Sequence, residues 1–119
     1  MVDRAIRPLF NPEMRNDVQV ILTALSWDGE NDSQIPALIG ASIALASSNI
    51  PWNGPIAGAR VGRVDGQWKL NPSFVEREAG GMDLVVAGTP DKVIMVEAGC
   101  HELPEAEMLS AMQFGAKEM

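Results

Sequence analysis

The stretch IPWNGPIAGARVG at residues 50–62 decides the fold of this chain. It places two prolines and three glycines between a segment with helical periodicity and a segment with strand periodicity. Proline fixes φ and removes a hydrogen-bond donor, whereas glycine tolerates conformations that other residues avoid. The stretch therefore predicts a specific irregular backbone path that joins a helix on one side to a hairpin on the other.

The residues just before this stretch predict a helix over residues 35–47. Apolar side chains recur there with helical spacing, and Pro36 in the first turn costs no hydrogen bond. Asp32 or Ser33 is the expected N-cap, because a short polar side chain can accept from the free N–H groups of a first turn.

The N-terminal part of the chain is less regular. Residues 18–25 are rich in branched and apolar side chains and predict a largely buried strand. Residues 4–14 contain Pro8 and Pro12, which interrupt helices, so this part is expected to be an irregular connector.

Two hairpins are expected after the Pro/Gly stretch. Residues 59–64 and 67–70 flank an Asp-Gly pair, which tolerates the positive φ angles of a two-residue turn. Residues 83–87 and 92–98 predict a second hairpin around a Gly-Thr-Pro-Asp turn.

A final helix is expected from Leu103, with Pro and acidic residues in its first turn and a buried stripe of Met108, Leu109 and Met112. The order of elements predicts an α+β fold, in which helices cover one face of a two-layer, mostly antiparallel sheet. This sheet is expected to have an open edge.

The composition sets limits on the class of protein. A chain of 119 residues with 46% apolar content supports one modest core. The net charge of −7 repels phosphate backbones, so a nucleic-acid contact requires a local basic patch. One cysteine excludes an internal disulfide, and neither an export signal nor a membrane span is present in the pattern. A cytoplasmic location and no membrane partner are therefore expected.

Several separate blocks resemble the polynucleotide phosphorylase (polyribonucleotide nucleotidyltransferase) family. They are DRAIRPLF at residues 3–10, IGAS at residues 39–42, the Pro/Gly stretch, the Asp-Gly hairpin and DLVVAGT at residues 83–89, in that order. The likeness is to the later part of the first ribonuclease-PH-like core domain. Residues 1–119 are therefore expected to be a single partial domain of the ribonuclease PH type, incomplete at its N-terminus, and to be the non-catalytic core.

The resemblance implies an activity for the whole protein. Members of this family are magnesium-dependent homotrimers that degrade RNA, including mRNA, from the 3′ end by phosphorolysis, and they release nucleoside diphosphates. This segment would contribute to ring assembly and to the RNA channel. The second core, which carries the phosphate-binding and principal catalytic residues, and the C-terminal RNA-binding modules have no counterpart in these residues. The isolated chain is therefore expected to be inactive.

Arg4 and Arg7 match the two arginines of the family's first block and are the predicted RNA-binding residues. The rigid fork of a guanidinium suits phosphate recognition by paired hydrogen bonds. The competing interpretation is that they pair with carboxylates such as Asp3 or Glu13, or brace a subunit interface.

No metal or catalytic residue is predicted in this segment. In the catalytic core of the family, two aspartates hold the metal, and the later one aligns with Asp83. The earlier position falls near Arg77, and a cation there repels a divalent ion. Magnesium is therefore expected only in the full-length enzyme.

Other candidate residues favour structural roles. Arg60 and Arg63 lie three residues apart on a strand, so their side chains are expected on opposite faces. Asn53 in a Gly/Pro turn is expected to satisfy its own backbone. Cys100 and His101 are adjacent in an extended segment, where their side chains point apart and cannot form a nucleophile–base pair.

A second interpretation remains open. The chain would be a stand-alone, non-catalytic scaffold that binds RNA or partner subunits, and its open sheet edge would then be hidden by association.

Overall fold

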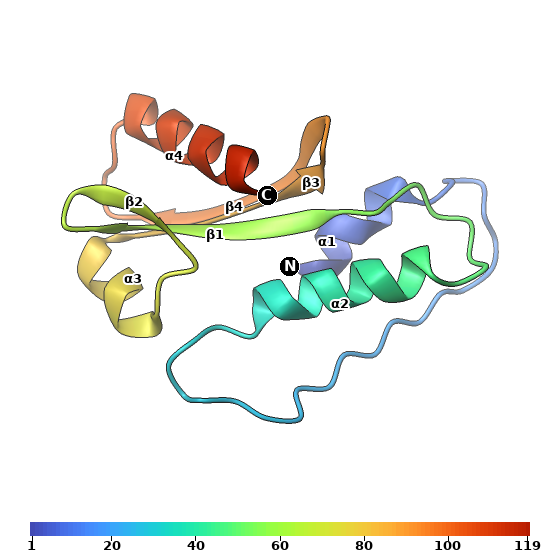
Figure 1. Ribbon diagram of the computed structural model, residues 1–119. Coiled ribbons are helices and arrows are strands. Elements are labelled where there is room, and N and C mark those ends of the chain that lie inside the picture. Colours follow the sequence, from blue (N-terminus) through green and yellow to red (C-terminus); the bar gives the residue numbers. More distant parts are fainter.

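The computed structural model describes every residue from Met1 to Met119. Its centre is a four-stranded antiparallel sheet with strand order β2-β1-β3-β4 (Figure 1). The helices and strands, in chain order, are α1 (Val2–Ile6), a 3-10 turn (Arg7–Leu9), α2 (Gln34–Ala46), β1 (Ala57–Val64), β2 (Gln67–Leu70), α3 (Phe74–Gly80), β3 (Met82–Thr89), β4 (Lys92–Cys100) and α4 (Glu105–Glu118).

Both predicted hairpins are present. The β1–β2 turn is the Asp65-Gly66 pair, whose φ angles of 50° and 78° are the positive values that this two-residue turn requires. In the second hairpin, Thr89 pairs with Lys92, so only Pro90 and Asp91 form the turn. The strands therefore extend beyond the predicted bounds, because backbone pairing continues past the apolar residues that signal a strand.

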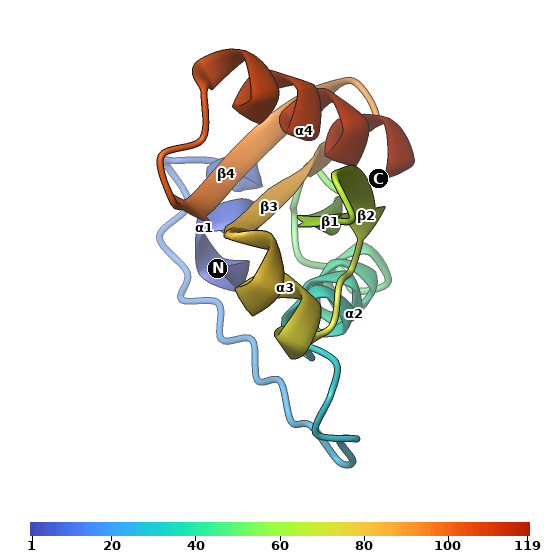
Figure 2. The ribbon, with the colours of Figure 1, turned by 90° about the vertical axis from the view of Figure 1, so that its left-hand side faces the viewer.

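The α+β class and the antiparallel sheet are confirmed, but the prediction that helices cover one face is wrong. Helix α4 lies on one face of the sheet, and α1 and α2 lie on the other (Figures 1 and 2). Alternation along β3 explains this arrangement. Leu84 and Val86 face α4, whereas Val85 and Ala87 face α1 and α2, so both faces of the strand are apolar and both need cover.

Helix α4 sits close to the sheet because Gly115 faces it. A Cβ atom at this position would lie 2.7 Å from Val86 Cγ2 and 2.8 Å from Val61 Cγ2, so any other residue would force the helix or these valines to shift. The predicted stripe is partly wrong. Met108 and Met112 are half-buried, but Leu109 is 55% exposed, and Ala111 and Gly115 form the buried contact instead.

The Pro/Gly stretch leads from α2 past the N-terminal helix to the sheet. Trp52 Nε1 donates to Ile6 O at 3.0 Å, and the Asn53 backbone N–H donates to Leu9 O at 3.0 Å. The exposed Asn53 side chain makes no hydrogen bond within the chain, so the turn is held by backbone and tryptophan contacts rather than by the predicted asparagine side chain.

Three local predictions need correction. Residues 4–14 are not wholly irregular, because α1 precedes Pro8 and the proline sits in the 3-10 turn that ends the helix. Residues 18–25 are extended but form no strand, since no neighbouring strand pairs with them. Helix α3 was not predicted, although Ser73 and Glu76 form a capping box at its start.

The helix predicted over residues 35–47 is confirmed within one residue at each end. Its cap differs from a standard N-cap. Ser33 occupies the cap position without a side-chain hydrogen bond, and Asp32 Oδ1 accepts from the Gln34 backbone N–H at 2.7 Å. Asp32 is thus fixed at the entrance of α2, next to the sheet.

Candidate functional site

Arg4 and Arg7 lie on consecutive turns at the N-terminal end of the chain, where α1 meets strand β4. Both side chains are well exposed, at 57% and 75%. A shallow depression beside them is bordered by Pro8 and by Ile94, Met95 and Val96 of β4. The two predicted RNA-binding residues are therefore close together and accessible.

Each of these arginines already has a carboxylate partner. Arg7 contacts Asp3 through two hydrogen bonds of 2.6 and 3.1 Å, and this hydrogen bonding, with the charge of Asp3, raises the pKa of Arg7. Arg4 donates to Glu97 Oε2 at 2.7 Å and to Val96 O at 3.3 Å. Exposed pairs of this kind contribute about 0–1 kcal/mol each, so a phosphate can compete for either guanidinium.

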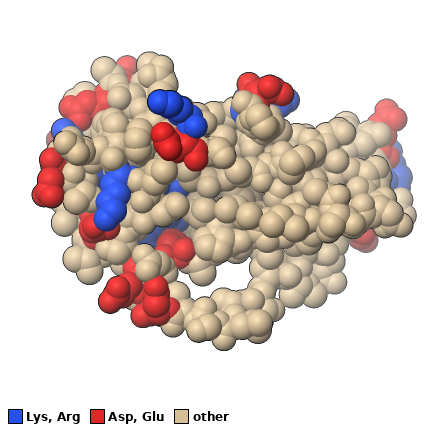
Figure 3. Space-filling view, viewed as in Figure 1, with Lys and Arg blue, Asp and Glu red and all other residues tan.

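Positive and negative side chains are mixed on one face of the molecule. On the face shown in Figure 3, Lys and Arg side chains are interspersed with Asp and Glu. A nucleic-acid contact on this face would therefore depend on a few individual cations rather than on a broad positive field.

An ion-pair cluster joins β1, β3, α3, the first residue of α2 and the loop that precedes this helix. The side chain of Arg60 is only 5% exposed, and its Nη1 lies 2.6 Å from both carboxylate oxygens of Asp83. Its Nη2 donates to Gln34 Oε1 at 2.6 Å and contacts Asp32 Oδ2 at 3.0 Å. Arg77 Nη1 completes the cluster, 3.1 Å from both Asp32 Oδ2 and Asp83 Oδ2.

This cluster does not fit a divalent metal. A magnesium ion needs hard oxygen ligands that are free to coordinate it. Here the carboxylates of Asp32 and Asp83 are held by two guanidinium groups, and no group of three or more His, Cys, Asp or Glu residues is placed to hold an ion. The expected position of Arg77 beside Asp83 is confirmed by the 3.1 Å contact.

Sequence reasoning missed Arg60 and Asp32 as members of this cluster. The expectation that Arg60 and Arg63 point to opposite faces is confirmed, since Arg63 contacts Glu107 of α4 at 2.7 Å on the other side of the sheet. The alternation of side chains along the strand predicts which face Arg60 occupies. Nothing in the sequence spacing predicts that Asp32 contacts it.

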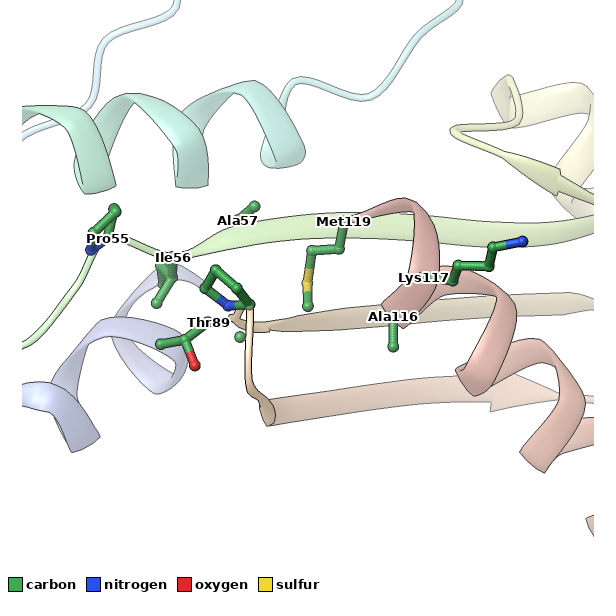
Figure 4. A pocket seen from close by; sticks show the side chains of 9 residues that line it. Pro55, Ile56, Ala57, Thr89, Ala116, Lys117 and Met119 are labelled. Atoms are coloured by element: carbon green, nitrogen blue, oxygen red, sulfur yellow. The ribbon is translucent and has the colours of Figure 1, made fainter.

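A cavity of about 360 Å³ lies between the start of β1, the β3–β4 turn and the end of α4 (Figure 4). Lys117 is the one charged side chain that lines it, and in Figure 4 its ammonium group points away from Thr89. The remaining lining is mostly apolar or small, so the cavity presents no acid–base pair. Cys100 and His101 lie outside it, at the exposed end of β4.

No helix in the structure has both the length and the apolar character needed to cross a membrane.

Comparisons with known proteins agree on one family. Residues 54–118 match the family model described as "3' exoribonuclease family, domain 2". Polyribonucleotide nucleotidyltransferases of Acholeplasma laidlawii and Pelotomaculum thermopropionicum are 54% and 55% identical to this chain over 115 residues, which cover 97% of the chain and 16% of each relative. That of Heliobacterium modesticaldum is 51% identical over 119 residues, which cover 100% of the chain and 17% of the relative.

The chain thus spans about one sixth of the length of these relatives. The resemblance to polyribonucleotide nucleotidyltransferase extends through the connector, helix α2 and the sheet, and is confirmed across nearly all residues. The family match begins within the Pro/Gly stretch, at Gly54, and covers the four strands, α3 and α4. This chain therefore belongs to the 3′ exoribonuclease family, and its sheet and α4 correspond to domain 2 of that family.

Proposed function

We propose that this chain acts as part of a polyribonucleotide nucleotidyltransferase that degrades RNA from its 3′ end by phosphorolysis and releases nucleoside diphosphates. The observation that carries the proposal is the identity of about half of all residues, along essentially the whole chain, with proteins of that name. RNA and inorganic phosphate would be the substrates. The complete protein would be a magnesium-dependent, cytoplasmic homotrimer.

Within that enzyme, residues 1–119 would be part of the first, non-catalytic core domain. The arrangement at Asp83 supports this role. Its carboxylate is held by Arg60 and Arg77, so it is not available as a metal ligand or as a general base. Magnesium, phosphate and the reacting bond would be bound by other parts of the enzyme, and this segment would contribute to ring assembly and to the RNA path.

The RNA contact is assigned to Arg4 and Arg7. Both guanidinium groups are exposed and lie beside the same depression. An RNA phosphate would displace Asp3 from Arg7, or Glu97 from Arg4. In each case a charge-assisted, bidentate hydrogen bond to the phosphate would replace a weak surface ion pair. These residues would position the RNA and take no part in the bond-breaking step.

A chimeric enzyme tests this proposal. The matching region of the Acholeplasma laidlawii relative is replaced by this chain, and phosphate-dependent release of nucleoside diphosphates from RNA is measured. We expect the chimera to be active. The Arg4→Ala/Arg7→Ala double variant should raise KM for RNA about tenfold with little change in kcat, the pattern of a lost binding contact.

The salt dependence gives a second readout. Loss of two phosphate contacts on single-stranded RNA should lower the slope of log affinity against log salt by about 1.4. Arg15→Ala is the matched control, because Arg15 is an exposed arginine near the same end of the chain that makes no ion pair. If the double variant keeps the RNA affinity and the salt slope of the parent, the assigned role of Arg4 and Arg7 is wrong.

One observation favours the second candidate, a stand-alone scaffold. Residues 18–27 expose large apolar side chains that association would cover, including Ile21 at 76% and Leu25 at 94%. The size of the native protein separates the two functions. A blot of source cells that shows a band several times larger than 12.8 kDa supports the enzyme, whereas a single band at 12.8 kDa supports the scaffold.

A further inference from the structure

A second hollow borders Arg7, on the side of the connector that follows α1. It has a volume of about 260 Å³ and is lined by α1 and by residues between 10 and 18, whereas the depression described above lies toward β4. Asp3 and Arg7 border both hollows, so their ion pair lies where the two meet. A ligand group in the second hollow would therefore lie next to any phosphate that Arg7 binds.

One wall of this hollow is Phe10. This residue is half-buried, its ring lies 6.4 Å from that of Trp52 between centroids, and the two residues also form a backbone bridge. The apolar lining is completed by three buried or half-buried side chains, those of Ile6, Met14 and Val18. Unstacked bases of single-stranded RNA are commonly bound against aromatic side chains. A wall that is apolar and fixed by packing therefore suits a flat nucleobase.

The rim of the hollow carries polar side chains. Asn11 Oδ1 accepts from the Glu13 backbone N–H at 2.9 Å, which leaves the Asn11 amide nitrogen free to donate. Asn16 and Asp17 are exposed, and their side chains make no hydrogen bond or ion pair within the chain. An apolar wall with a few uncommitted polar groups around it is the usual arrangement of a small-molecule subsite.

Capture of an RNA phosphate by Arg7 would change the needs of this hollow. Asp3 accepts two hydrogen bonds from Arg7, at 2.6 and 3.1 Å. A phosphate that takes over these donors leaves the Asp3 carboxylate without a partner at the border of the hollow. An ionised carboxylate can only accept hydrogen bonds, so it then requires a donor from the ligand itself.

We propose that this hollow is a nucleobase subsite of the RNA path, and that it favours adenine and cytosine over uracil. The inference rests on the proposed function and adds a preference among bases to it. Asp3 and Asp17 set the preference. Adenine and cytosine carry an amino group, which donates to a carboxylate, where uracil carries a carbonyl oxygen, which a carboxylate repels. The amide of Asn16 both donates and accepts, so it matches either kind of base.

Binding of RNA to the chimera, without inorganic phosphate so that no RNA is degraded, tests the preference. The probes are oligo(A), oligo(C) and oligo(U) of equal length. The ratio of the affinities for oligo(A) and oligo(U) should fall about tenfold in Asp3→Asn/Asp17→Asn, because an amide can donate to the uracil carbonyl. The phosphates are the same in both RNAs, so the effect of freeing Arg7 from Asp3 cancels in this ratio.

Matched substitutions control for charge. Asp17→Asn alone leaves the Arg7 pair intact and should lower the ratio severalfold. Glu13→Gln removes the same charge from an exposed residue of the connector that does not border the hollow, and it should leave the ratio unchanged. If the double variant keeps the ratio of the parent, or if Glu13→Gln lowers it as much as Asp17→Asn, the subsite does not exist as assigned.

The third RNA distinguishes the amino group from the size of the base. In the double variant, the affinity for oligo(C) relative to oligo(U) should fall as that for oligo(A) does. If only oligo(A) responds, the hollow selects a purine by its size and the assignment to the amino group is wrong.

Two further measurements separate the alternatives. AMP that binds the parent more tightly than oligo(A) does, and loses that affinity in the double variant, would assign the hollow to a free nucleotide and overturn the RNA subsite. A chimera whose base preference depends on Asp3 and Asp17 but that releases no nucleoside diphosphates when phosphate is added contradicts the proposed function and leaves the subsite intact. An active chimera whose base preference is the same in parent and double variant contradicts the subsite alone.

Discussion

Replacement of Arg60 by Met should destabilise the chain strongly, because it removes one side of a buried ion-pair cluster. The Arg60 side chain is 5% exposed and makes contacts of 2.6 to 3.0 Å with Asp83, Gln34 and Asp32. Breaking a buried pair from one side typically costs about 3–5 kcal/mol, since the other charge stays desolvated. Asp83 is 41% exposed and can be rehydrated, which places the expected loss near 3 kcal/mol.

Urea denaturation of the 119-residue chain, followed by circular dichroism, measures this loss. Arg63→Met is the matched control on the same strand. Arg63 and Glu107 are 37% and 40% exposed, so their pair contributes about 0–1 kcal/mol. If Arg60→Met costs no more free energy of unfolding than Arg63→Met, the buried cluster does not stabilise the fold and the argument is refuted.

Three other predictions concern single features of the same chain. Ser73→Ala removes the capping box of α3 and should cost about 1 kcal/mol of unfolding free energy, whereas Ser73→Thr should cost much less. Gly115→Ala forces a methyl group against two valines of the sheet and should cost about 1–3 kcal/mol, while Gly40→Ala on the open side of α2 should be neutral or stabilising. Hydrogen bonds from the Asn31 backbone and side chain lower the pKa of Asp28 from 3.8 to about 2. Because this pKa is depressed in the folded state, the loop is stabilised above about pH 4 and loses that contribution as the pH falls toward 2. An NMR titration of the Asp28 carboxyl should therefore give a midpoint near 2 in the parent and a higher midpoint in Asn31→Ala, which loses the side-chain donor but keeps the backbone N–H donors of residues 30 and 31; equal midpoints would contradict a contribution of the side-chain hydrogen bond.

The hairpins and α2 could be predicted because their signals are local. The Asp65-Gly66 turn, the alternation in β3 and the Pro36 start of α2 each depend on a few neighbouring residues. Helix α3 carried a local signal as well, in the Ser73–Glu76 capping box, but its seven residues make only about two turns, which is too short for a clear helical periodicity.

The features that could not be predicted depend on distant parts of the chain. The cluster around Arg60 draws on four separate elements, and no spacing in the sequence indicates that Asp32 reaches the sheet. The pattern of residues 18–25 indicates burial between other strands, and the structure shows that the 119 residues do not supply them. The apolar pattern of residues 18–25 therefore indicates that the segment requires burial, although these 119 residues do not bury it.

The hydrogen bond from Arg4 to Val96 links the N-terminal helix to the edge of the sheet. Strand β4 is at the edge of the sheet, and an edge carbonyl is a point at which a foreign strand can attach. Arg4 occupies that carbonyl at 3.3 Å while its other nitrogen holds Glu97. A phosphate that captures this guanidinium releases the carbonyl at the same time. The position of the Arg4 side chain thus couples phosphate binding at α1 to the accessibility of the β4 edge.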